Sequence, residues 1–245
     1  MSSSRRATAR RLSDVLARLQ RTGRRANVVA RAYYGITAEA HYGLTMPQLR
    51  RLGREIGTDH VLALDLWSTR NLDARVLATL VDDPIAVTPE QMEEWAADFD
   101  SWAICDGACQ DLFTKTPFAH EKALAWSHRP EEFVKRAGFA LMAKLAVHDR
   151  AAPDARFRGY LRRIRAEAYD ERRYVRKGVN WALREIGKRN AKLRTDAVRT
   201  ARAIARRSSS AARWIASDAL RELESEAVRL RVRRRPVGTR RRAQK

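Results

Sequence analysis

Apolar and polar residues follow a helical period along most of the chain, and residues 171–188 show this most clearly. At about 100° per residue, one side of this segment is apolar. That side consists of Val175, Val179, Ala182 and Ile186. The opposite side places an aromatic ring among three cations within a narrow arc, namely Lys177, Trp181, Arg184 and Lys188. The pattern predicts a helix with a core face and a solvent face that is both aromatic and cationic.

An aromatic ring between cations suits a surface that meets phosphates and the faces of sugars or bases. The alternative is ordinary packing, in which Trp181 lies against a neighbouring helix and the cations extend past it to water. Because tryptophan is more often buried than exposed, this segment alone favours the packing interpretation.

The same periodicity predicts a chain built of helices. β-branched residues are scattered, Ala, Leu, Arg and Glu dominate, and no segment is typical of a strand. The predicted helices cover residues 10–22, 26–34, 46–57, 59–68, 71–83, 89–98, 101–114, 117–127, 131–147, 153–168, 171–188, 191–207 and 211–228. Short connections pair them as hairpins of roughly 30 to 40 residues, which favours an all-α fold of the α-solenoid class without a strict sequence repeat.

Several predicted helices have recognisable start signals. Thr45, Thr88 and Thr116 each precede a proline by one or two residues, which predicts a capping hydroxyl with proline in the first turn. Asn71 and Ser101 are predicted caps of the same kind.

The predicted domain organisation is simple. No Gly/Ser-rich linker interrupts residues 26–228, so we predict one helical domain over residues 9–228. The basic segment 229–245 lacks a core face and is predicted to be disordered, as are residues 1–8.

The formal charge of +21 is unevenly distributed. Residues 1–25 carry a net +7 and residues 229–245 a net +9. Between them, residues 154–207 carry +12, whereas residues 26–153 carry −5 and residues 208–228 carry −2. A bias toward arginine in the genome explains the ends more easily than the polarised body. This distribution predicts a polyanionic partner, and nucleic acid fits better than a membrane surface.

The composition argues against several classes of protein. No apolar run approaches the roughly 18 residues that span a membrane, and no secretory signal follows Met1. Cys105 and Cys109 lie four residues apart in one predicted helix, as expected of reduced core thiols in a cytosolic protein. The five histidines show no ligand spacing with these cysteines, so no metal site is predicted. The chain has no phosphate-binding glycine loop, nucleophile elbow or dinucleotide fingerprint.

Two further segments carry candidate chemistry. Trp102 and Asp106 lie one helical turn apart at the edge of an apolar arc. This position fits two interpretations equally well: a functional pair, or a tryptophan at the edge of the core beside a solvated carboxylate. Arg136 is predicted to lie opposite the core side of its helix, flanked by the small residues Ala140 and Ala143. Such neighbours permit another backbone to approach closely. The guanidinium suits either a bidentate phosphate contact or an ion pair between helices.

Three motifs follow one another in the chain: Trp102-x-x-x-Asp106, Arg136 in a Lys-Arg-Ala segment, and Trp181 in Gly-Val-Asn-Trp-Ala-Leu-Arg-Glu. Supporting matches are Gly43-Leu44, Pro47 and Leu66-Trp67. In this order and at these intervals they resemble the AlkD-type DNA alkylation-repair glycosylases. The resemblance covers the chain from about residue 26 to residue 225.

The resemblance implies an α-solenoid of HEAT-like helical repeats with a concave basic face that wraps duplex DNA. It also implies excision of cationic alkylated purines such as 3-methyladenine and 7-methylguanine. Carried over by position, Trp102 and Trp181 lie against the deoxyribose of the lesion. Asp106 is then the catalytic carboxylate and Arg136 the phosphate clamp, with Tyr34 as a further contact.

The chain departs from the family pattern at a few places. Ser101 stands where a family member has a second tryptophan, and neither the basic ends nor the Cys105/Cys109 pair is a family feature. These departures bear on the choice of lesion more than on the basic chemistry.

The implied chemistry agrees with the residues present. An alkylated purine already carries positive charge, so its departure leaves a sugar that resembles an oxocarbenium ion. Asp106 would stabilise that cation and orient water, and the two indole faces would add quadrupole attraction. Because the matched set holds no lysine, a Schiff-base lyase step is not expected.

We therefore expect a monofunctional glycosylase that acts as a monomer on duplex DNA containing alkylated bases. Lys177, Arg184 and Lys188 are expected to be further DNA contacts. No cofactor, metal or membrane is expected, and the expected location is the cytoplasm, on the nucleoid. Two alternatives remain: a non-catalytic HEAT-like DNA-binding scaffold, and a protein–protein adaptor solenoid that binds acidic partners.

Overall fold

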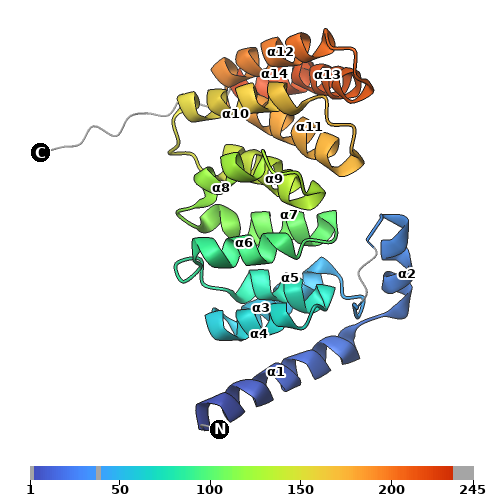
Figure 1. Cartoon of the computed structure of the whole chain (residues 1–245), viewed down its shortest axis with the longest axis vertical. Helices are drawn as coiled ribbons and strands as arrows, with labels where there is room; N and C mark the ends of the chain where they lie inside the picture. Colours follow the sequence, from blue (N-terminus) through green and yellow to red (C-terminus); the bar gives the residue numbers. More distant parts are fainter. Residues whose placement is uncertain (1–2, 37–39, 234–245) are drawn as a thin grey trace, which may run out of the picture. The chain divides into compact units, whose positions relative to one another are not determined.

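The computed structural model describes residues 3–36 and 40–233, and every regular element in these two stretches is helical (Figure 1). The α-helices are α1 (Ser3–Thr22), α2 (Arg25–Tyr33), α3 (Met46–Ile56), α4 (His60–Ser68), α5 (Leu72–Val81), α6 (Pro89–Ala97), α7 (Trp102–Asp111), α8 (Ala119–Trp126), α9 (Glu132–His148), α10 (Asp154–Glu167), α11 (Arg173–Gly187), α12 (Ala191–Ala205), α13 (Ser210–Leu223) and α14 (Glu226–Arg233). A short 3-10 helix, η1 (Phe113–Lys115), follows α7. The predicted all-α fold class is confirmed.

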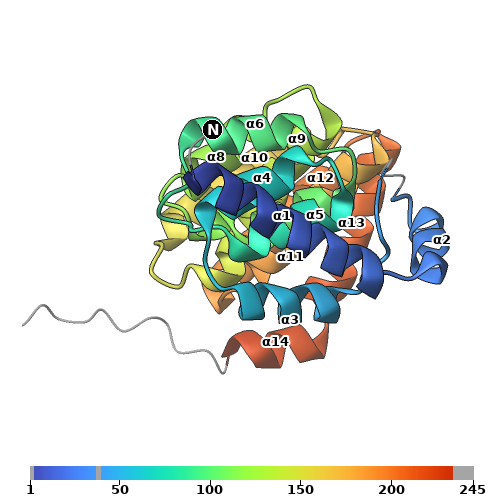
Figure 2. The same ribbon diagram turned by 90° about the horizontal axis from the view of Figure 1, so that it is seen from below.

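The helices form two compact units, the first ending at Phe118 and the second beginning at Ala119. In the first unit, α5 contacts α3, α4 and α7. In the second, α8 pairs with α9, α10 with α11, and α12 with α13, and these pairs follow one another as layers in Figure 1. The helix α2 buries none of its residues and stands apart from α3–α7 in Figures 1 and 2.

A stacked pair of indoles forms the centre of the first unit. The ring centroids of Trp67 and Trp95 lie 3.9 Å apart, and the rings are nearly parallel. The guanidinium of Arg75 lies 5.0 Å from the centroid of the Trp67 ring. Asp98 accepts hydrogen bonds from Nε1 of Trp67 at 3.0 Å and from Nη2 of Arg75 at 2.8 Å. Because the indole N–H of Trp67 is paired, burial of its ring carries no penalty from an unmatched donor.

The helix α9 of the second unit is almost wholly buried. Residues 134–143 are buried without a break, because α8, α10 and α11 all pack on this helix. A Cβ atom at Gly138 would lie 2.5 Å from the backbone nitrogen of Ser127. One at Gly178 would lie 3.5 Å from Cγ of Arg136. Glycine thus permits the backbone at the end of α8 to touch α9 directly.

The N-terminal boundary of the helical region differs from the prediction. Residues 1–8 were expected to be disordered, whereas α1 begins at Ser3. The segment lacks proline and glycine, so nothing in it stops the helix that follows from extending backwards.

The C-terminal boundaries differ as well. The predicted helix over residues 211–228 is two helices, because the hydroxyl of Ser225 ends α13 by donating to the carbonyl of Glu222 and begins α14 by accepting the N–H of Val228. The predicted start of a disordered tail at residue 229 is wrong, since α14 continues to Arg233. Val228 and Val232 supply it with a buried face. Residues 234–245 lie outside the described residues, and the single domain over residues 9–228 stays a prediction.

Two of the predicted helix caps are confirmed. The side chain of Asn71 accepts two N–H groups of the first turn of α5, and the hydroxyl of Thr88 accepts the N–H of Gln91 at 3.2 Å. At Thr45, the side-chain oxygen of Gln48 accepts the backbone N–H at 2.8 Å, so the two residues form part of a capping box.

Two other caps differ from the prediction. The hydroxyl of Thr116 donates to the carbonyl of Phe113 at 2.9 Å, and α8 begins only at Ala119, so Thr116 does not cap it. Ser101 does occupy the position before α7. Its buried hydroxyl, however, makes no hydrogen bond to any residue that the structure describes.

The contact at Gly138 gives a test of the helix packing. Gly138→Ala should destabilise the protein by about 1–3 kcal/mol, because the new methyl group meets the backbone at Ser127 and backbone atoms cannot move aside. Gly159→Ala in α10 is the matched control, since its Cβ would lie 3.7 Å from the flexible end of Arg162. Thermal melts should show a lower Tm for the first variant and an equal or higher Tm for the second. An unchanged Tm for Gly138→Ala would contradict the close helix contact.

Candidate nucleic-acid interface

Trp102 is the first residue of α7 and is half-buried in the first unit. Its indole N–H donates a hydrogen bond to the backbone carbonyl of Tyr34 at 2.8 Å. The side chain of Tyr34 is 70% exposed. The structure therefore brings together two of the predicted site residues, which lie 68 positions apart in the sequence.

Asp106 follows Trp102 by one helical turn on the same edge of α7 and is also half-buried. The core face of the helix is fully buried and consists of Ile104, Cys105, Ala108, Cys109 and Leu112. The predicted apolar arc is confirmed. Trp102 and Asp106 lie at its border, where each side chain keeps part of its surface in water.

A buried carboxylate holds the segment that carries Tyr34. Asp73 of α5 is fully buried and forms an ion pair with Arg31 of α2. The same carboxylate accepts the backbone N–H groups of Tyr42 at 2.7 Å and Gly43 at 2.9 Å. Charge-assisted hydrogen bonds therefore fix α2, which has no buried side chain of its own.

Trp181 is half-buried on α11, in the second unit. The predicted core face of this helix is confirmed, because Val175, Val179, Ala182 and Ile186 are fully buried. The ammonium group of Lys144, on α9, lies 4.9 Å from the centroid of the Trp181 ring. Trp181 thus borders a neighbouring helix and also forms a cation–π contact, with a lysine that the sequence analysis did not identify.

Lys177 lies among other cations. It is exposed, and partial desolvation together with the positive charges of Arg173 and Arg136 lowers its pKa. A cation surrounded by like charges gains from an anionic partner, so Lys177 keeps the environment expected of a phosphate contact.

Arg184 and Lys188 already have acidic partners on or near α13. Arg184 lies 3.1 Å from a carboxylate oxygen of Asp218 and also pairs with Glu222. Lys188 lies 2.8 Å from Glu222 and 2.7 Å from Glu185. These ion pairs compete with phosphates, so the two residues differ from Lys177 although all three share one face of α11.

Arg136 is buried, with 7% of its surface exposed. The prediction that it faces away from the core is wrong, because helices pack on α9 from all sides. Its Nη1 donates to the carbonyl of Tyr174 at 2.8 Å, which ties α9 to the first turn of α11. An added Cβ at Gly178 would lie 3.6 Å from the carbonyl oxygen of Arg136, which is an ordinary contact distance. A role of Arg136 as a phosphate clamp stays a prediction.

Trp214 of α13 was not among the predicted site residues. Its ring is 37% exposed and lies 5.3 Å from the guanidinium of Arg176. The signal was available, since the apolar period of α13 places residue 214 off the core face. We call the following residues the aromatic–cationic surface of the second unit: Lys144, Arg173, Arg176, Lys177, Trp181 and Trp214.

The candidate residues thus fall into two groups. Tyr34, Trp102 and Asp106 belong to the first unit, whereas Arg136 and Trp181 belong to the second. Within each unit, contacts between helices place the group at the edge of the core, and the individual roles carried over from the resemblance stay predictions.

Neither a metal-binding cluster nor a helix able to cross a membrane is found among the described residues. Cys105 and Cys109 are not joined in a disulfide and are fully buried in the core of α7, as predicted. His120 has a structural setting, since its ring nitrogens lie 2.6 Å from the hydroxyl of Tyr160 and 2.8 Å from the carboxylate of Asp149.

Comparison with solved structures finds a protein of the same fold. It is described as belonging to "a new family of proteins related to the HEAT-like repeat DNA glycosylases with affinity for branched DNA structures". The two chains are 18% identical, with a TM-score of 0.72 over 86% of this chain and 95% of the other. At this identity the likeness shows a HEAT-like repeat fold.

Comparison with curated proteins gives no match. A family model described as "DNA alkylation repair enzyme" matches residues 15–223, which is most of the chain and includes every helix from α2 to α13. The chain therefore belongs to the DNA alkylation repair enzyme family.

Proposed function

We propose that this protein is a monofunctional DNA glycosylase that hydrolyses the N-glycosidic bond of cationic alkylated purines in duplex DNA. The substrates in question are lesions such as 3-methyladenine and 7-methylguanine. Membership of the DNA alkylation repair family supports the class of substrate. The observation that carries the enzymatic part is the position of Trp102 and Asp106, one helical turn apart at the partly exposed edge of α7.

The carboxylate of Asp106 supplies the electrostatic part of the mechanism. As the neutral purine leaves, positive charge moves to the deoxyribose, and a fixed negative charge stabilises that state more than the ground state. The same oxygen atoms orient a water molecule for attack on the anomeric carbon. Acid assistance to the leaving group is not required, because the alkylated base already carries positive charge.

Each unit presents one indole ring for contact with DNA. The hydrogen bond from Trp102 to the carbonyl of Tyr34 fixes the orientation of its ring, so little order has to be gained when the sugar binds. Trp181 already has a cation, Lys144, near its face. An aromatic ring that attracts an ammonium group also attracts a sugar cation.

A non-catalytic DNA-binding scaffold is the second candidate. It is favoured by the solved structure of the same fold, which is described by its affinity for branched DNA. Under this alternative, the aromatic–cationic surface binds DNA and Asp106 has no chemical role. Family membership favours either DNA-directed function over the protein–protein adaptor.

Asp106→Asn separates the two candidates. Loss of one preorganised charge should slow single-turnover release of 7-methylguanine by about 10² to 10³. Duplex affinity and Tm should stay near those of the unmodified protein. The matched control is Asp100→Asn, which removes an exposed carboxylate just before α7 and should leave excision unchanged. Equal excision rates for the two variants would remove Asp106 from the mechanism and favour the scaffold.

Trp181→Ala tests whether this ring serves the site or the core. The ring is half-buried, so its loss should lower Tm only slightly while it slows excision. Trp126→Ala is the comparison in the same unit, because Trp126 is fully buried and its truncation should cost about 3–5 kcal/mol. Thermal melts and single-turnover rates on both variants provide the readout. A large loss of stability in Trp181→Ala with normal chemistry would show that this ring serves packing.

Lys177 of α11 and Lys188, which directly follows this helix, should differ in their contribution to DNA binding. Lys177→Gln should flatten the dependence of log affinity on log salt by about 0.9, the value for one phosphate that is no longer neutralised. Lys188→Gln should leave that slope nearly unchanged and should lower Tm instead, because Lys188 pairs with Glu185 and Glu222. Titrations of undamaged duplex over a range of salt concentrations measure both slopes. If Lys188→Gln flattened the salt dependence and Lys177→Gln did not, the ion pairs of Lys188 would have to open when DNA binds.

A further inference from the structure

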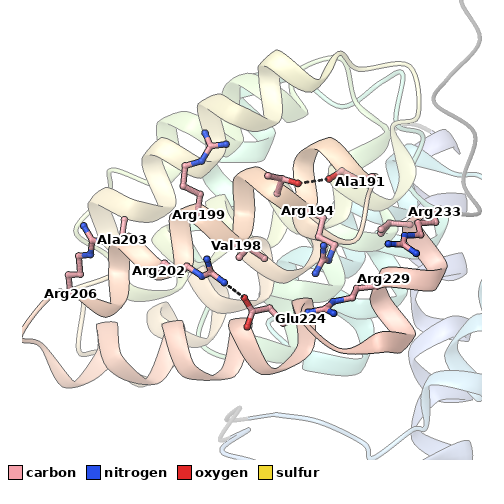
Figure 3. A pocket seen from close by; sticks show the side chains of 12 residues that line it. Ala191, Arg194, Val198, Arg199, Arg202, Ala203, Arg206, Glu224, Arg229 and Arg233 are labelled. Carbon is pink, nitrogen blue, oxygen red and sulfur yellow. Dashed lines mark hydrogen bonds and ion pairs between the residues drawn. The ribbon is translucent and has the colours of Figure 1, made fainter.

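A cavity of about 700 Å³ lies in the second unit between α12 and α14 (Figure 3). Its lining is dominated by arginines, which are Arg194, Arg199, Arg202, Arg206, Arg229 and Arg233. Val198 and Val232 contribute apolar surface. The cavity shares no residue with the aromatic–cationic surface, whose members belong to α9, α11 and α13.

The charges in this cavity are poorly balanced. Its one lining carboxylate, Glu224, pairs with Arg202 at 2.7 Å. In the part of the chain that the structure describes, the side chains of Arg206, Arg229 and Arg233 have no acidic partner. An anion that enters the cavity would therefore meet guanidinium groups that are not already neutralised.

One end of the cavity concentrates positive charge. In Figure 3, the guanidinium groups of Arg194, Arg229 and Arg233 gather at the end beside α14. Arg194 is held in place because its Nε donates to the carbonyl of Leu223 at 2.7 Å. Burial and the charge of Arg229 lower the pKa of Arg194, and the charge of Glu224 opposes this effect. Like charges held this close are stabilised by a shared counter-anion.

The arrangement of the arginines fits a chain of phosphates. A guanidinium presents a planar fork of donors that matches phosphate oxygens. Along α12, Arg194 and Arg206 are separated by about 18 Å at 1.5 Å rise per residue. A row of this length can meet more than one phosphate of a DNA strand at once. A single small anion would use only one end of such a row.

We propose that this cavity is a second phosphate-binding site that takes the sugar–phosphate backbone of DNA, away from the aromatic–cationic surface. The proposal goes beyond the glycosylase activity and does not depend on it, because it concerns binding only. A protein with two such sites holds two stretches of DNA backbone at once.

The test compares two full-length triple variants with the same change in charge. The first is Arg206→Gln/Arg229→Gln/Arg233→Gln, which removes the unpaired cations of the cavity and leaves the paired Arg194 and Arg202 in place. The matched control is Arg150→Gln/Arg162→Gln/Arg165→Gln, which removes three exposed arginines outside the cavity in the same unit. All six side chains lie at the surface or the cavity rim, so the two melting temperatures should agree.

Binding to an undamaged duplex of about 30 base pairs is measured over a range of salt concentrations. The cavity variant should flatten the log–log slope by about two to three, at roughly 0.9 for each phosphate that is no longer neutralised. The control should flatten it by less than one. Equal slopes for the two variants would overturn the proposal, whether or not the unmodified protein excises any base.

Inorganic tripolyphosphate tests whether the cavity binds a small soluble polyphosphate and not the phosphates of DNA. It should compete with duplex for the unmodified protein only weakly, because it can occupy only part of the row of arginines. A different outcome would overturn the assignment to DNA. In that outcome, tripolyphosphate binds the unmodified protein tightly and the cavity variant not at all, while the cavity variant and the control triple variant bind duplex equally. The site would then belong to a soluble polyphosphate. Single-turnover excision at saturating protein should be the same for the cavity variant and the unmodified protein.

Discussion

Direct contact between helix backbones fixes the second unit. At Gly138 the end of α8 touches α9 with no room for a side chain, and at Gly178 the backbone of α11 lies against Arg136. With α8, α10 and α11 packed on it, α9 has no free face over residues 134–143. The rotation of α11 about its axis is then set, because its apolar side must meet this core. Trp181 and Lys177 consequently stay at the surface, so the exposed chemistry of the second unit follows from the packing beneath it.

In the first unit, a buried charge has the corresponding role. α2 buries none of its residues, and the carboxylate of Asp73 holds it through Arg31 and through two backbone N–H groups beyond it. This link positions the carbonyl of Tyr34, which in turn orients the ring of Trp102. A fully buried carboxylate without this cation would carry a large desolvation penalty. Asp73 therefore holds α2 only while its ion pair with Arg31 is intact.

The sequence predicted well what depends on local spacing. The two faces of α11 and the apolar arc of α7 followed from a period of 3.6 residues, since that period reports burial directly. Contacts between distant positions left no such signal. Arg31 and Asp73 are 42 positions apart, and Arg184 meets Asp218 over 34 positions, so neither ion pair could be read from a single sequence. Arg136 was placed on an outer face because the pattern of one helix does not show how many neighbours cover it. The split at Ser225 was missed because both helices continue a similar apolar period.

The burial of Cys105 and Cys109 has a chemical consequence for a protein of this family. Reagents that alkylate purines also attack sulfur, and the thiolate is the reactive form. Both sulfur atoms are fully buried in the core face of α7, next to its partly exposed edge, and these are the two cysteines of the chain. An electrophile reaches them only when α7 opens. The helix that carries Asp106 is thereby shielded from covalent inactivation by the same compounds that damage DNA.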